Sequence, residues 1–113
     1  MRVVNVDSAE HYNWGTVCDG WRLLNHPDLA VTQERIPPGG GEVKHYHARS
    51  RQLFYVLQGS LQIDTGETIE KLERGDSIEI PPGQHHNVKN PSDLDAHFLV
   101  VSAPSTANDR VNL

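Results

Sequence analysis

GGGEVKHYHARSRQLFYVLQG, residues 39–59, is the stretch that decides the fold. His45 and His47 lie two positions apart, and side chains with that spacing in a strand point to the same face. Two imidazoles side by side on a β face can hold a divalent metal ion. On a helix the pair would diverge, because metal-binding histidines there are four positions apart. The aromatic and branched residues 53–57 favour a strand, and Gly59 closes a turn.

A second histidine stretch follows at residues 75–90, GDSIEIPPGQHHNVKN. Its Pro-Pro-Gly sequence, residues 81–83, predicts a tight turn. This turn delivers His85 and His86 onto the next strand.

The two stretches together resemble the cupin family. The first reads G-x5-H-x-H-x4-Q-x6-G from Gly39 to Gly59, and the second reads G-x5-P-x-G-x2-H-x3-N from Gly75 to Asn90. The first departs at one position, since cupins usually carry Glu where this chain has Gln52. The resemblance implies an all-β double-stranded β-helix, or jelly-roll barrel, with a metal inside its wide end.

The strand pattern agrees with an all-β fold. We expect one domain over residues 1–113, with an N-terminal arm at 1–25, a barrel at about 29–102 and a polar surface tail at 103–113. Many short strands separated by Pro and Gly turns, with no amphipathic helix, predict a sandwich or barrel. The expected strands are 29–36, 42–47, 51–58, 60–65, 68–72, 77–80, 85–89 and 94–102.

Composition restricts the partners. Ten basic and fifteen acidic residues give a net charge of −5, and there is no basic run, so binding to nucleic acid or to anionic membranes is not expected. No apolar run approaches the ~20 residues of a membrane helix, and no signal peptide is visible. The single Cys18 fits a cytoplasmic location. Trp14 and Trp21 either pack across the outside of the barrel or lie in a dimer interface, and the resemblance favours a homodimer.

The predicted metal site consists of His45, His47, Gln52 and His86 around one divalent ion, either Zn, Ni, Mn or Fe. The alternative is that the histidines are ordinary polar residues in an empty barrel. Gln52 adds no charge, so a dication there would be a stronger Lewis acid and an oxidised iron would be less stabilised. If Gln52 is not a ligand, water fills its place.

Other residues could act on a substrate. His97 is the candidate general base if it points into the barrel, but both faces of its strand are mostly apolar, so its direction is open. Gln33 and Arg35 share one face of the strand at 29–36, and Glu34 takes the other. An inward Arg35 would favour an anionic substrate.

These patterns predict a small metalloenzyme that acts on a carbonyl or hydroxyl group of a small molecule such as a sugar acid, by isomerisation, cyclisation or a lyase reaction. A three-histidine, one-glutamine set is similar to that of cupins among polyketide cyclases and among small proteins that open unsaturated uronate sugars. Two alternatives remain: a dioxygenase that uses non-haem iron or another metal, and a non-catalytic module that binds a small ligand.

Overall fold

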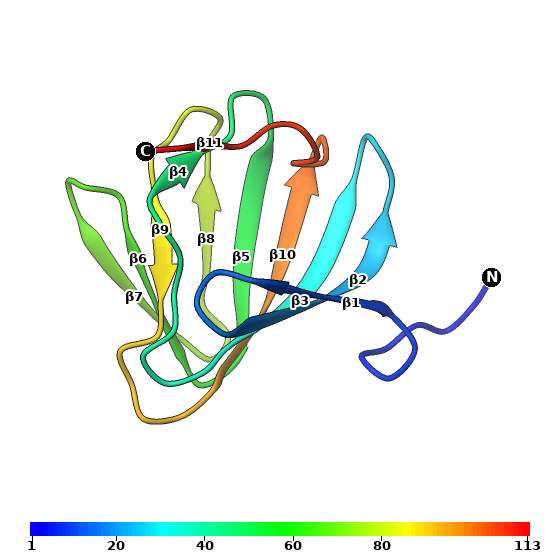
Figure 1. Ribbon diagram of the computed structural model, residues 1–113, viewed down its shortest axis with the longest axis horizontal. Helices are drawn as coiled ribbons and strands as arrows, with labels where there is room; N and C mark the ends of the chain where they lie inside the picture. The colour runs from blue at the N-terminus through cyan, green and yellow to red at the C-terminus, as the bar shows by residue number, and fades with distance from the viewer.

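The computed structural model describes residues 1–113 and contains strands but no helix (Figure 1). The all-β prediction is therefore confirmed. No helix is present that could cross a membrane. The strands are β1 (Glu10–Trp14), β2 (Cys18–Asn25), β3 (Ala30–Ile36), β4 (His45–Tyr46), β5 (Arg51–Gln58), β6 (Ser60–Asp64), β7 (Ile69–Glu73), β8 (Ser77–Ile80), β9 (Asn87–Lys89), β10 (Ala96–Ala103) and β11 (Val111–Asn112).

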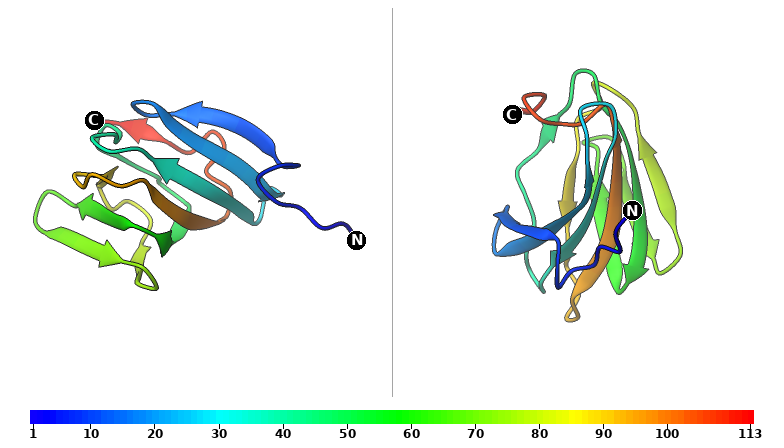
Figure 2. Two further views of the ribbon diagram at one scale, coloured as in Figure 1. Left: turned by 90° about the horizontal axis from the view of Figure 1, so that it is seen from below. Right: turned by 90° about the vertical axis from the view of Figure 1, so that its right-hand side faces the viewer.

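The strands form two sheets and one short pair. A six-stranded sheet has the order β1-β2-β3-β10-β5-β8, a three-stranded sheet has the order β7-β6-β9, and β11 pairs with β4. All pairings are antiparallel. Buried side chains from both sheets form one hydrophobic cluster, so the sheets are two walls around a single core, as in a double-stranded β-helix (Figures 1 and 2).

Side-chain alternation decides which residues enter the barrel. In β5, Gln52, Phe54 and Val56 are buried, while the residues between them face outward. In β10, Phe98 and Ser102 are buried and His97 lies on the opposite face, half-buried. The direction of His97, which the sequence leaves open, is thus away from the barrel interior.

Residues 1–25, which the sequence predicts to be an arm, contain two strands of the larger sheet. Strands β1 and β2 continue the six-stranded sheet beside β3 (Figure 2). Trp14 packs edge-on against the buried Phe98 ring, with centroids 6.5 Å apart, and its indole N–H donates to the Asp19 carbonyl at 2.8 Å. Trp14 therefore packs against the core, and it lies neither across the outside of the barrel nor in a dimer interface. Trp21 lies 5.7 Å from the His11 ring.

The C-terminal residues also differ from the expected surface tail. Strand β11 pairs with β4, and the C-terminus lies beside β4 in Figure 1. Asp109 is buried, and its carboxylate accepts hydrogen bonds from the backbone N–H groups of Ala48, Arg49 and Ser50 at 2.8, 3.0 and 2.9 Å. The Asp109 carboxylate thus holds residues 48–50, the loop that follows His45 and His47, and we call this contact the Asp109 clamp.

Gly59, the last residue of the first motif, has a conformational role. Its φ of +76° is one that glycine adopts at little cost. A side chain there would also collide with the Asp95 carbonyl oxygen. Both requirements explain why the turn between β5 and β6 needs glycine.

Candidate metal centre

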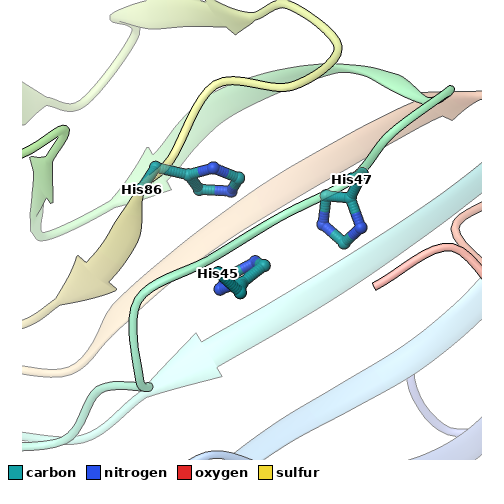
Figure 3. Close-up of side chains that lie close together, drawn as sticks. All are labelled: His45, His47 and His86. Carbon is teal, nitrogen blue, oxygen red and sulfur yellow. The ribbon is translucent and has the colours of Figure 1, made fainter. Parts of the chain in front are cut away.

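Three histidines from the two sequence motifs meet inside the barrel (Figure 3). A backbone bridge joins the motifs: His45 N–H donates to the His86 carbonyl at 3.0 Å, and His86 N–H donates to the His45 carbonyl at 2.9 Å. The ring centroids of His45 and His86 are 4.4 Å apart, and that of His47 lies 5.0 Å from the first and 5.8 Å from the second. Their candidate ligand atoms all lie within 4.8 Å of one another.

Each imidazole is oriented by a backbone carbonyl. The Nδ1 atom of His45 bonds to the Val43 carbonyl at 2.9 Å, that of His47 to the Asp109 carbonyl at 2.5 Å, and that of His86 to the Gln84 carbonyl at 2.9 Å. Since a carbonyl only accepts, Nδ1 carries the hydrogen in each ring. Nε2 is then left as the lone-pair atom, the arrangement usual for metal-ligating histidines.

Burial keeps these rings neutral. It lowers the pKa of His45 to about 3 and that of His86 to about 4, although the backbone hydrogen bonds oppose the shift. The pKa of His47 is lowered for the same reason. Neutral imidazole is the form that binds a metal, so the site does not have to lose protons first at neutral pH.

Gln52 completes the polar end of the barrel. Its side chain is 7% exposed, and its Nε2 donates to the Ser102 hydroxyl at 3.1 Å. That bond fixes the amide and leaves Oε1 buried without a partner; His86 Nε2 is the other buried atom without one. Buried polar atoms are rarely left unpaired. Two unpaired lone-pair atoms beside neutral imidazoles fit a divalent cation.

A polar cavity of about 550 Å³ opens over this cluster. His45, His47, Gln52 and Glu34 lie on its walls. The Arg35 side chain instead faces away, where it pairs with Asp19 at 2.7 Å and Asp95 at 3.0 Å. Gln33 and Arg35 share one face of β3 and Glu34 lies on the other, so the face with Glu34 is the one that lines the cavity. Its other lining residues are Glu10, Tyr12, Trp14, Arg22, Leu24, Asn25, Ala30, Thr32, Glu42, Phe54, Val100, Ser102, Ser105, Thr106, Ala107 and Arg110.

A larger hollow of about 730 Å³ lies along Gly39–Gly41 and Lys89. It contains none of the three histidines, so size alone does not indicate the site. Among the predicted site residues, the structure brings His45, His47 and His86 together with Gln52 nearby on the cavity wall. It does not bring His97 to them. Sequence reasoning missed Tyr12 and Asp109, and no motif marks either residue.

The fold and this site define a small barrel protein with a buried histidine triad. The family described as "Cupin domain" matches residues 32–102. The chain therefore belongs to the cupin family, and the resemblance inferred from the two motifs is confirmed.

Three similar proteins extend the comparison. The tetracenomycin polyketide synthase protein TcmJ of Streptomyces glaucescens is 28% identical over 82 residues, which are 73% of this chain and 50% of that protein. The polyketide cyclase RemF of Streptomyces resistomycificus superposes with a TM-score of 0.80 at 22% identity, over 93% of this chain and 80% of that one. A sugar phosphate isomerase of the cupin superfamily from Silicibacter pomeroyi gives a TM-score of 0.77 at 24% identity, over 92% and 76%. This chain spans half the length of TcmJ, and the two structures show a shared fold.

Proposed function

We propose that this protein is a metalloenzyme in which His45, His47, Gln52 and His86 hold one divalent ion. Its substrate would be a small molecule with carbonyl or hydroxyl groups, such as a sugar acid, and its reaction an isomerisation, cyclisation or elimination. The observation that carries the proposal is the pair of buried unpartnered atoms, Gln52 Oε1 and His86 Nε2, beside imidazoles that burial keeps neutral.

The donor set favours one kind of chemistry. When bound, a divalent metal supplies Lewis-acid polarisation of a substrate oxygen. Gln52 and the three imidazoles bring no negative charge to offset that of the ion. The Ser102 hydroxyl fixes the amide, and the Asp109 carbonyl fixes the His47 ring, so the ligand atoms are positioned before any ion binds.

The cavity suits a small polar substrate. Trp14, Phe54 and Val100 provide apolar walls, while hydroxyls, carboxyls and guanidinium groups line the rest. A volume of about 550 Å³ lies within the range of small-molecule sites. The similarity to a polyketide cyclase and to a sugar phosphate isomerase supports a carbonyl-containing substrate.

The first experiment is metal analysis of protein purified without added metal or chelator, followed by reloading of the apoprotein with Zn²⁺, Ni²⁺, Mn²⁺ or Fe²⁺. We expect one ion per chain in the wild type and none after His45→Ala or His86→Ala. His97→Ala is the matched control, because it removes a histidine outside the cluster and should keep the ion. Full metal retention in both cluster variants would refute the site.

The second experiment tests the chemistry. Loaded protein is incubated with a panel of uronic acids and hydroxyketones in D₂O and followed by ¹H NMR. We expect a rearranged or deuterium-labelled product that the His86→Ala protein does not form. Consumption of oxygen by the ferrous protein would indicate a dioxygenase instead, and tight binding without turnover would indicate a binding module.

The subunit arrangement and location belong to the same proposal. We expect a homodimer in the cytoplasm. Leu53 and Tyr55, each 40% exposed on the outer face of β5, could contribute to a dimer contact. Light scattering after size exclusion measures the mass directly, and a mass of 12.6 kDa would refute the dimer.

A further inference from the structure

A second polar site crosses the three N-terminal strands. In the antiparallel register Tyr12 lies opposite Gly20, and Gly20 lies opposite Glu34. Residues directly opposite one another point to the same face of a sheet. Tyr12 and Glu34 are therefore on one face, separated by a position that has no side chain.

The missing side chain at Gly20 is what lets the two residues meet. The Tyr12 ring occupies the space above Gly20, and a Cβ there would overlap ring atoms and the hydroxyl. From this position the Tyr12 hydroxyl donates to Glu34 Oε2 at 2.6 Å. This is the side-chain hydrogen bond that the protein gives to the Glu34 carboxyl. Both side chains line the cavity that His45 and His47 also line.

The surroundings of Glu34 contain no free cation to pair with it. Arg22 lies over the Tyr12 ring at 4.3 Å and is paired with Glu10, and across the cavity Arg110 is paired with Glu42. The residue opposite Glu34 on β2 is Gly20, and the residue opposite it on β10 is the apolar Phe98.

With no cation to pair with it, the buried Glu34 carboxyl favours its protonated form. Burial raises the pKa of Glu34 to about 8, partly opposed by the hydrogen bond from Tyr12, and Glu42 raises it further. Burial and the neighbouring Glu34 also raise the pKa of Tyr12 well above its usual range, so its hydroxyl keeps its hydrogen. A carboxylic acid that stays neutral in a cavity can donate a proton.

We propose that Glu34, positioned by Tyr12, is the proton donor and acceptor of this cavity and acts on an oxygen or an adjacent carbon of a small hydroxy- or keto-acid. This inference rests on the proposed function. The Glu34 carboxyl gives its proton to one substrate atom, and the resulting carboxylate keeps the Tyr12 hydrogen bond. It then takes a proton from another substrate atom, so an isomerisation consumes no co-reactant.

The acidic substrate follows from the charge balance. Around the cavity Arg22 is paired with Glu10 and Arg110 with Glu42, and burial favours the neutral form of both Glu34 and Glu42. A dication held by neutral ligands would leave the cavity positive. A substrate carboxylate neutralises that charge.

The first test needs neither metal nor substrate. Protein labelled with ¹³C at glutamate side chains is titrated and followed by NMR, with Glu34→Gln to assign the resonance. Glu42→Gln is required too, because burial raises the pKa of Glu42 to about 7. We expect Glu34 to titrate near 8. Tyr12→Phe and Gly20→Ala should each move its pKa upward, because both remove the hydrogen bond that favours the carboxylate. Titration of Glu34 together with the exposed glutamates would overturn the proposal.

The second test measures binding of D-glucuronate, the probe acid, to the zinc-loaded protein by calorimetry. Glu34→Ala should weaken probe binding about tenfold and leave zinc stoichiometry at the wild-type value. Glu67→Ala removes an exposed glutamate and is the control, which should bind the probe with wild-type affinity. Unchanged probe affinity in zinc-loaded Glu34→Ala would refute this role. Failure of the wild type to bind zinc, or of the zinc form to bind the probe, would refute the proposed function or its substrate class, and Glu34 would then be judged on its titration alone.

With any substrate found in the D₂O panel, Glu34→Gln should lower kcat by about 10² to 10⁴, with a much smaller change in KM. A kcat at the wild-type value would also refute the proposal.

Discussion

Replacing Asp109 with alanine tests how the site is held. The substitution removes a carboxylate that accepts three backbone hydrogen bonds from residues 48–50. The Ser50 N–H is buried, so leaving it unpaired costs about 1–3 kcal/mol, and the two more exposed N–H groups each lose about 1 kcal/mol after water replaces the carboxylate. The sum is roughly 3–5 kcal/mol, a large fraction of the 5–15 kcal/mol typical of a domain.

The assay is guanidinium unfolding followed by tryptophan fluorescence in the presence of EDTA. We expect Asp109→Ala to lower the free energy of unfolding by about 3 kcal/mol and Tm by about 12 °C. Asp109→Asn keeps one carbonyl oxygen and should lose about half as much. Asp93→Ala removes an exposed aspartate and is the control. A loss below about 0.5 kcal/mol for Asp109→Ala would show that the clamp does not stabilise the fold.

The same variant has a pH signature. Although burial would raise the pKa of Asp109, the hydrogen bonds from the backbone of Ser50, Arg49 and Ala48 lower it below its usual value. A lowered folded-state pKa contributes stability that is present above the unfolded pKa and is lost as pH falls through the folded value. The difference between wild type and Asp109→Ala should therefore shrink below about pH 4. In EDTA-free buffer Asp109→Ala should also weaken zinc binding about tenfold, because the backbone carbonyl of residue 109, which orients His47, is no longer held in place by the carboxylate's bonds to residues 48–50.

Three further variants test other parts of the structure. Asn90→Ala should lower the free energy of unfolding by about 3 kcal/mol in a chemical denaturation experiment. The fully buried Asn90 amide donates to the Ile36 and Leu94 carbonyls, and its oxygen accepts two hydrogen bonds from Ser92. Wild-type stability in this variant would contradict the prediction. Gln52→Glu should tighten zinc binding about tenfold in calorimetry by adding a negative charge, and an unchanged affinity would mean that residue 52 is not a ligand. The folded pKa of Glu34 lies above its unfolded value, so its contribution to stability is lost as pH rises from about 5 through 8. Over that range Glu34→Gln should lose less stability than wild type, by about 3 kcal/mol, and parallel pH curves would refute this.

Sequence patterns predicted the elements that repeat with a strand period. β5 and β8 begin and end at the predicted residues, 51–58 and 77–80. The meeting of His45, His47 and His86 could also be expected, because two spaced motifs define which strands come together. These features depend on local alternation and turn chemistry, which a single sequence records.

Other features depend on register or on long-range pairing, which a single sequence does not record. The direction of His97 could not be predicted because both faces of β10 are apolar, and only its position between β3 and β5 decides which face meets the core. Tyr12 and Glu34 meet only because of the register of three strands. Asp109 is one polar residue in a polar segment, and nothing near it in sequence shows that it clamps residues 48–50.

The clamp at Asp109 has a kinetic consequence. Its backbone contact to His47 spans 62 positions of the chain, and the Ser50 hydroxyl reaches the Pro104 carbonyl across 54. Closing loops of this length is slow and costly in entropy, so such contacts form late in folding. An unfolded chain offers a metal only local histidine pairs, His45 with His47 and His85 with His86. An ion bound to the finished site should then leave the folding rate almost unchanged and slow unfolding instead.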